Sequence, residues 1–256
     1  MPKELERKAK SLSVAIIARN AAGQIEPCLK SAAFADEIVL VDSGSTDETV
    51  EIALKCGARV IHQDWLGFGR QKQFAVSQAA HDWVLCLDAD ERVSEKLRAS
   101  IEQALAAPRF RAYRMARCNR FMGRWLRHGE GYPDWSLRLF DRTAARWSDD
   151  AVHEKVLTEA EIGTLEGDLL HESAEDLASY LDKQNRYTTL QAEKMLAQGR
   201  RAHLGHLLLS PVLRFIRFYL LRLGFLDGLP GLVHIAIGCF NSFMKYAKLL
   251  ALQQGK

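Results

Sequence analysis

Two aspartates separated by one residue, Asp88 and Asp90, directly follow the apolar run 84–87. A short apolar run is typical of a buried strand, so both carboxylates are expected at a strand end. Mg²⁺ or Mn²⁺ rarely receives an all-protein cage and usually bridges one or two carboxylates to substrate phosphates. An isolated Asp-x-Asp could instead cap the helix expected near Ser94. The strand-end position favours a site for a metal and a diphosphate.

Three more side chains occupy positions suited to a nucleotide. Asp42 follows the apolar run 38–41, and its carboxylate could accept hydrogen bonds from a uracil ring or from ribose hydroxyls. Arg70 and Lys72 lie in a Gly-containing segment at a predicted helix start, where phosphates are favoured. For either basic residue alone, a solvated surface position fits nearly as well.

The elements that must position these residues alternate between strand and helix. Apolar runs predict strands, and the stretches between them predict helices: strands at Leu12–Ala18, Glu37–Val41, Ala58–Ile61 and Trp83–Leu87, and helices from about Asp47 to Cys56 and from Gln71 to Ala80. Such alternation predicts an α/β fold with a mainly parallel sheet, right-handed crossovers and helices on both faces. Ligands then bind beyond the carboxyl ends of the strands, so the polar clusters there are expected to converge.

Composition restricts the class of protein. The 256 residues carry a formal net charge of only +3, which does not predict a nucleic-acid partner. The five cysteines are widely spaced and form no C-x-x-C pair, so reduced core thiols are expected. The first ten residues lack the apolar segment of a secretory signal, and we therefore expect catalysis to face the cytoplasm.

Several motifs resemble those of family 2 inverting glycosyltransferases. The three that carry the resemblance are L-S-V-A-I-I-A-R-N, V-D-S-G-S-T-D-E-T and L-D-A-D-E-R-V. The later pieces D-W-L-G-F-G-R-Q-K-Q, G-Y-P-D-W-S-L-R-L-F, V-H-E and G-F-L-D-G-L-P-G look like the lipopolysaccharide core β-1,4-glucosyltransferase branch. The resemblance extends from about Leu12 to the last predicted helix, so it concerns nearly the whole chain.

The resemblance implies a GT-A (Rossmann-like) fold, with a nucleotide-sugar-binding and catalytic domain at residues 1–172. The polar and then apolar pattern of residues 173–256 predicts a C-terminal helical annex that is associated with the membrane surface. The implied reaction moves a hexose, glucose from UDP-glucose, to a hydroxyl of a lipid-linked lipopolysaccharide core, with Mn²⁺ or Mg²⁺ as cofactor.

By position, the resemblance also implies roles for individual residues. Asp42 resembles the family's nucleoside-binding aspartate, Asp88 its ribose or metal contact, and Asp90 its principal metal ligand. Asn20 matches a nucleoside contact, although many relatives follow it with an acidic residue where this chain has Ala21.

An inverting transfer to a hydroxyl needs a general base on the acceptor side. Glu154 is the first choice, because in the resembling fold an acidic base follows the Asp-x-Asp element after an acceptor loop. Asp134 is the second choice, and Glu130 and Asp141 are further candidates. His171 is the late histidine that such enzymes often use as a metal ligand, although a structural role is commoner for a lone histidine.

Aromatic residues and His153 complete the acceptor half. Segment 111–170 has short strand-like pieces separated by Gly, Pro and aromatic residues, and we expect it to build the acceptor side. Trp125, Tyr132 and Trp135 could stack on sugar faces, but packing is the commoner role of such residues. His153 adjoins the predicted base and is, like His171, a candidate metal ligand.

The last fifty residues are strongly apolar. Arg214, Arg217 and Arg222 fall within one helical arc of roughly 140°, which predicts an interfacial helix that meets anionic headgroups. The following run, Gly228–Met244, contains no Lys, Arg, Asp or Glu, but it is marginal against the about 20 residues of a spanning helix. We therefore predict peripheral attachment at the cytoplasmic face of the inner membrane. A buried helical hairpin or a dimer interface would leave the same pattern.

Other functions fit parts of this pattern. Polyprenyl-phosphate glycosylation would use the same fold and need no strong base, because a phosphate attacks. A noncatalytic nucleotide-sugar-binding membrane scaffold would bind the donor without turnover. A nucleotidyltransferase could also use Asp-x-Asp, but the basic Gly-rich loop expected for that chemistry is not evident.

Overall fold

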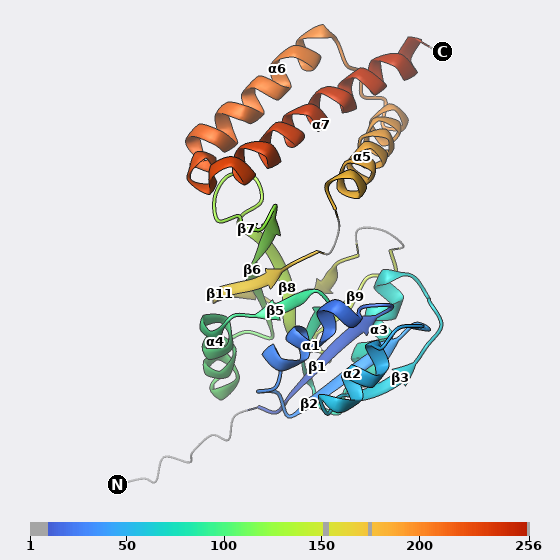
Figure 1. Cartoon of the computed structure of the whole chain (residues 1–256), viewed down its shortest axis with the longest axis vertical. Helices are drawn as coiled ribbons and strands as arrows, with labels where there is room; N and C mark the ends of the chain where they lie inside the picture. Colours follow the sequence, from blue (N-terminus) through green and yellow to red (C-terminus); the bar gives the residue numbers. More distant parts are fainter. Residues whose placement is uncertain (1–9, 151–153, 174–175, 255–256) are drawn as a thin grey trace. The chain divides into compact units, whose positions relative to one another are not determined.

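The computed structural model describes residues 10–150, 154–173 and 176–254, which form two compact units (Figure 1). The first unit contains the described residues of Met1–Arg117 and Asp134–Glu172, and the second contains those of Cys118–Pro133 and Ser173–Lys256. Sequence analysis placed all of residues 1–172 in one domain. The structure instead groups segment 118–133 with the C-terminal helices.

The first unit is built on a mixed β-sheet in the order β3-β2-β1-β4-β8-β6-β11-β5. Its first four members are β1 (Leu12–Ala18), β2 (Glu37–Asp42), β3 (Arg59–His62) and β4 (Trp83–Asp88), which pair in parallel. The remaining members are β5 (Glu91–Val93), β6 (Ala112–Phe121), β8 (Asp134–Asp141) and β11 (Ile162–His171). β8 runs antiparallel to both β4 and β6. The predicted α/β fold is therefore confirmed, with antiparallel strands added beyond the parallel half.

Helices cover both faces of the parallel half. They are α1 (Ala22–Ser31), α2 (Thr49–Lys55), α3 (Phe68–Ser77) and α4 (Glu95–Ala106). Alternate residues of β1 point to opposite faces, so Val14 and Ile16 join the core under α1, α2 and α4. Ala15 and Ile17 join the core under α3 and the short strand β9 (Ala145–Trp147). β9 pairs with β10 (Val156–Thr158) in a separate two-stranded sheet.

Parallel pairing brings the strand ends of β1, β2 and β4 to one edge. Ala18 is opposite Asp42, and Ile17 is opposite Asp88, so the chain leaves all three strands at nearly the same level. The polar residues after these strands therefore gather at one edge, as expected for a sheet of this class.

The second unit consists mainly of helices. They are α5 (Leu177–Ala197), α6 (Leu204–Phe215), the π-helical turn η1 (Ile216–Leu221), the 3₁₀ turn η2 (Gly224–Asp227) and α7 (Gly228–Gln254). The short strand β7 (Arg124–Trp125) pairs with the end of β6. α7 packs against both α5 and α6 (Figure 1).

Segment 118–133 is held to these helices by polar contacts. The buried carboxylate of Asp227 accepts hydrogen bonds from the backbone N–H groups of Arg127 and His128. Glu130 forms an ion pair with Arg214 of α6. A Cβ at Gly238 of α7 would meet the Glu130 carboxylate, so glycine at this position leaves room for the pair in its observed arrangement. These contacts explain why the segment belongs to the helical unit.

The same unit exposes many large apolar side chains. On α6 and η1 they include Leu204, Leu208, Leu209, Val212, Leu213, Ile216, Leu220 and Leu221. By length and composition two stretches could cross a membrane, Leu204–Leu221 and Gly224–Gln254, with mean hydropathies of 1.4 and 1.2. Core helices of soluble proteins can meet the same criterion, but no residue of the first stretch is buried in the structure.

Candidate active site

Asp42, the last residue of β2, and Asn20, in the loop after β1, lie at the sheet edge, where the loops that follow the two strands are hydrogen-bonded to each other. The buried Asp42 carboxylate accepts hydrogen bonds from the backbone N–H groups of Gly44 and Ser45 at 2.9 and 3.0 Å. Gly44 has a φ of 83°, which favours glycine in this turn. The Asn20 side-chain oxygen accepts from the backbone N–H of Thr46 at 2.8 Å, and the backbone N–H of Asn20 donates to Ser45 Oγ. Both predicted nucleoside contacts thus also stabilise these loops.

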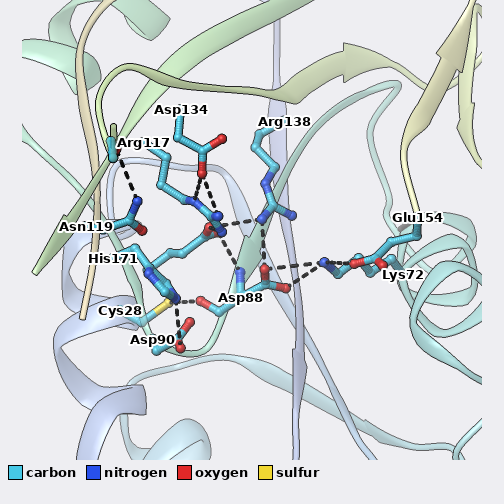
Figure 2. Close-up of polar contacts among 12 residues, drawn as sticks. Cys28, Lys72, Asp88, Asp90, Arg117, Asn119, Asp134, Arg138, Glu154 and His171 are labelled. Atoms are coloured by element: carbon cyan, nitrogen blue, oxygen red, sulfur yellow. Dashed lines mark hydrogen bonds and ion pairs between the residues drawn. The ribbon is translucent and has the colours of Figure 1, made fainter. Parts of the chain in front are cut away.

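The two carboxylates of the Asp-x-Asp element point to different partners (Figure 2). Asp88, the last residue of β4, lies 2.9 Å from Lys72 Nζ and 2.8 Å from Arg138 Nη2. Asp90 Oδ2 lies 3.2 Å from His171 Nε2, at the end of β11. Asp-x-Asp could alternatively have capped the next helix, α4. In the structure Ser94 is the N-cap of α4, and its side chain accepts a hydrogen bond from the N–H of Leu97.

Electrostatics keep Asp88 ionised. Burial alone would raise the pKa of this carboxyl, but the positive charges of Arg138 and Lys72 outweigh it and hold the pKa well below its usual range. Burial raises the pKa of the neighbouring Glu91 carboxyl, and Arg138 offsets that effect only in part. Burial alone would lower the pKa of Arg138, whereas Asp88 and Glu91 raise it above its usual range. The site therefore holds Asp88 as a fixed negative charge between two cations.

Arg138 and Glu91 were not among the predicted site residues. Arg138 projects from β8 to Asp88 and Glu91, and Glu91 also accepts a hydrogen bond from the Asp88 N–H at 3.0 Å. Both side chains are buried. The available sequence signal was the single arginine inside the apolar stretch L-R-L-F of segment 137–140, since a buried guanidinium requires anionic partners.

Lys72 is buried in α3 and joins Asp88 to Glu154. Its Nζ atom lies 3.0 Å from Glu154 Oε1 and 4.9 Å from the centre of the Trp147 ring. A cavity of about 390 Å³ lies beside it, and its lining includes Asp88, Arg138, Trp135 and Glu154. Arg70 is exposed on the same helix, so the structure does not bring it into this cluster.

The remaining base candidates occupy different places. Asp134 pairs with Arg117 at 2.6 Å, beside the cluster in Figure 2. Asp141 is opposite Trp83, at the start of β4 and therefore at the far end of the strand from Asp88. Glu130 belongs to the second unit. His153 lies outside the described residues.

The aromatic candidates divide in the same way. Trp135 lines the cavity and is 47% exposed, and the Arg114 guanidinium lies over one face of its ring. Trp125 and Tyr132 belong to the second unit. The cavity also contains Trp147, which sequence analysis did not select.

The donor set at Asp90 fits a hard divalent cation that is shared with a substrate. Within the described ranges, no group of three or more His, Cys, Asp and Glu residues could hold a metal by itself. A carboxylate and an imidazole adjoin each other at Asp90 and His171, and phosphate oxygens usually complete a Mg²⁺ or Mn²⁺ site. Asp88 is already paired with two cations, so it is the less available of the two aspartates.

The open sheet with acidic residues at its carboxyl edge fits the GT-A fold, and comparison with known proteins assigns the family. Residues 13–156 match the model of glycosyl transferase family 2. Because this match spans more than half of the chain, the protein belongs to glycosyltransferase family 2, and the resemblance drawn from the motifs is confirmed.

Individual relatives extend this match beyond the family model. The chain is 32% identical over 246 residues to the lipopolysaccharide core biosynthesis glycosyltransferase LpsC of Rhizobium meliloti, covering 93% of this chain and 91% of LpsC. It is 30% identical to an uncharacterized glycosyltransferase of Rickettsia typhi, covering 95% and 88% of the two chains. The crystal structure of S. aureus TarS 1–349 with UDP-GlcNAc has a TM-score of 0.50 at 15% identity, covering 96% and 92%, which concerns the fold alone.

Proposed function

We propose that this protein moves a hexose, glucose from UDP-glucose, with inversion onto a sugar hydroxyl of a lipid-linked lipopolysaccharide core. Membership of family 2 and the similarity to LpsC support this reaction. The main structural support is that the carboxylates of Asp88 and Glu154 lie 2.9 and 3.0 Å from the Lys72 ammonium nitrogen and line the same cavity. A donor-side carboxylate and a candidate base thus share one site.

On the donor side, Asn20 and Asp42 are the proposed nucleoside contacts. Their loops lie at the carboxyl edge of β1 and β2, where open α/β sheets bind ligands. Arg70 and Lys72 are the proposed phosphate contacts. Arg70 is exposed, so it would need to turn toward a bound diphosphate, whereas Lys72 already lies beside Asp88.

Asp90 and His171 are the proposed protein ligands of Mn²⁺ or Mg²⁺, with Asp88 as a further contact to the metal or the ribose. A bound divalent cation would supply positive charge to the leaving diphosphate. The pairing of Asp90 with His171 supports this assignment. Lys72 and Arg138 place two more positive charges around Asp88, where they favour binding of an anionic donor.

Glu154 is the proposed general base, with Asp134 as the second candidate. The acceptor hydroxyl oxygen would attack the anomeric carbon as the bond from that carbon to the diphosphate oxygen breaks. The hydroxyl proton would pass to the Glu154 carboxylate. The Trp135 ring, which lines the cavity, is the candidate platform for the acceptor sugar.

The second unit is the proposed annex that binds an anionic membrane surface, with the protein peripheral at the cytoplasmic face of the inner membrane. Its exposed leucines support attachment by apolar contact. The sequence predicted that Arg214, Arg217 and Arg222 contact anionic lipid headgroups. In the structure Arg214 pairs with Glu130 and Arg222 donates to the Tyr132 carbonyl, so Arg217 is the best placed of the three.

The test is to compare Glu154→Gln with Asp134→Asn, which delete the acidity of each candidate but keep its shape. Transfer from UDP-glucose to a lipid A–core acceptor is measured with Mn²⁺, together with donor affinity. We expect Glu154→Gln to lower kcat by about 10²–10⁴-fold with little change in donor affinity. Asp134→Asn should remain within several-fold of the wild type.

Other outcomes identify the alternatives. If only Asp134→Asn lowers kcat, Asp134 is the base. If both variants remain active, a phosphate acceptor that needs no base is the better explanation, and polyprenyl phosphate is then the acceptor to assay. Donor binding without transfer or donor hydrolysis in the wild type would support a noncatalytic scaffold.

A further inference from the structure

Lys72 is an unusual residue to bury in the middle of a helix. Its side chain is only 7% exposed, although lysine is almost never fully buried without partners. Its helix α3 begins at Phe68 and packs on the sheet beside β9. The backbone N–H of Trp147 donates to the Gln73 side chain at 2.8 Å, and its indole N–H donates to Cys86 Sγ at 3.3 Å, which orients the ring that the Lys72 ammonium faces.

The two carboxylates that Lys72 contacts come from distant parts of the chain. Asp88 ends β4, and Glu154 precedes β10. A lysine needs only one carboxylate to compensate its charge, and Asp88 is also paired with Arg138. The second contact, to Glu154, is therefore not required to balance Asp88. It does fix the position of a carboxylate that is itself only 19% exposed.

We propose that Lys72 is a positioning residue that holds the base Glu154 in register with the donor-side carboxylate Asp88. This inference rests on the proposed function of Glu154. Sequence analysis assigned Lys72 to phosphate binding alone, whereas the contacts of its ammonium group connect the donor half of the site to the acceptor half.

The physical basis is geometric. A general base must lie within hydrogen-bond distance of the proton that it removes, and a displacement of about 1 Å can cost about 10²-fold in rate. A Glu side chain has several rotatable bonds, so a fixed ammonium partner restricts where its carboxylate lies.

The experiment is a double-mutant cycle of Lys72→Met and Glu154→Gln. We expect Lys72→Met alone to lower kcat by about 10–100-fold and, because Lys72 is also a proposed phosphate contact, to raise the Kd of UDP-glucose in the presence of Mn²⁺. In the Glu154→Gln background, Lys72→Met should change kcat by less than about threefold, because the group that it positions no longer acts. Lys72→Arg, which keeps the charge, should recover part of the loss.

Lys55→Met is the matched control, since it removes an exposed lysine of α2 in the same unit. It should leave kcat unchanged. If Lys72→Met does not fold, as judged by its thermal transition, the same cycle is measured with Lys72→Arg and Glu154→Gln. A smaller loss that disappears in the Glu154→Gln background would again support the inference.

Three results would overturn the inference. If the fold-loss of kcat in the double mutant equals the product of the two single-mutant losses, Lys72 acts independently of Glu154. A higher donor Kd with unchanged kcat would make Lys72 a phosphate ligand only. Normal turnover of Glu154→Gln would remove the base itself, and the proposed mechanism would then fail together with the inference.

Discussion

The two units of this protein differ in where buried charge clusters are concentrated and where large apolar side chains are exposed. In the first, charged groups such as Asp88, Glu91 and Arg138 turn inward and pair with one another at the sheet edge. In the second, leucines of α6 and η1 turn outward, and Leu221 is 75% exposed. A buried charge destabilises the fold unless it is paired, and a large exposed apolar surface marks an interaction site. Each arrangement is unfavourable by itself, and a functional role explains it.

This difference separates two kinds of variant. Charges in the first unit are fixed by several partners, so removing one should change both chemistry and stability. Exposed leucines in the second unit contribute little to its own packing, so replacing them should change surface binding and leave the fold intact. Each prediction below tests one side of this contrast.

Loss of the principal proposed metal ligand should have the largest effect. We expect Asp90→Ala to lower metal-dependent transfer by about 10³-fold, because metal stabilisation of the leaving group contributes several kcal/mol. The measurement is UDP-glucose turnover across a Mn²⁺ titration. Asp82→Ala, an exposed aspartate just before β4, is the control and should behave as wild type. Substantial metal-dependent activity in Asp90→Ala would remove Asp90 from the site.

Apolar attachment predicts the next largest effect. The double variant Leu213→Ser with Leu221→Ser should weaken partition onto phosphatidylglycerol-containing vesicles by about 100-fold, because each leucine contributes about 1.5 kcal/mol on burial. The measurement is vesicle co-sedimentation, and the thermal transition should not move. Leu54→Ser, which removes an exposed leucine of the first unit, is the control. Unchanged binding by the double variant, or its unfolding, would favour a buried hairpin instead.

The sequence predicted the parallel half of the sheet well for a physical reason. β1 was predicted at its observed bounds, and β4 ends one residue later than predicted. Strands buried on both faces appear as unbroken apolar runs, and the polar residue that follows marks their end. α1 was not predicted, and it contains Pro27, which is unfavourable inside a helix.

The partners across the site could not be predicted in this way. Arg138 reaches Asp88 only because β8 pairs antiparallel with β4, a pairing between segments fifty residues apart. Lys72 was predicted to contact a phosphate, with a solvated surface position as the alternative, whereas in the structure it is buried and its ammonium faces Trp147 of β9. Arg214 was predicted to meet lipid, but Glu130, eighty-four residues away, pairs with it. Local patterns locate strand ends and helices, whereas ion pairs depend on tertiary contacts.

Asp88 should contribute to stability in a pH-dependent way. Its folded pKa lies below its usual range, so the unfolded chain takes up the proton first as the pH falls. The stability that the ionised carboxylate contributes is therefore complete above the unfolded pKa of about 3.9 and is lost below it. We expect Asp88→Asn to lower the free energy of unfolding by about 1.5–3 kcal/mol at pH 7.

Denaturant unfolding of wild type and Asp88→Asn between pH 7 and pH 3 measures this effect. The difference between the two proteins should shrink as the pH falls through about 4. Exposed Glu161 provides the control, since Glu161→Gln should show almost no difference at any pH. A constant difference for Asp88→Asn across this range would mean that its charge does not stabilise the folded state.

The smallest expected effect is a difference between an exposed arginine and an ion-paired arginine within the helical unit. Arg217 is exposed, and its guanidinium lies over the Phe218 ring, whereas Arg214 is paired with Glu130. A basic residue near an anionic surface contributes about 1 kcal/mol, so Arg217→Gln should weaken binding to anionic vesicles by about fivefold. The loss should diminish at high salt, because screening weakens the wild-type attraction. Arg214→Gln should instead lower the thermal transition, because it leaves Glu130 unpaired.

Vesicle binding is measured at low and high salt beside a thermal scan of each variant. If Arg217→Gln binds as wild type while Arg214→Gln alone loses binding without a loss of stability, the paired arginine faces the lipid and the assignment of these two side chains must be exchanged.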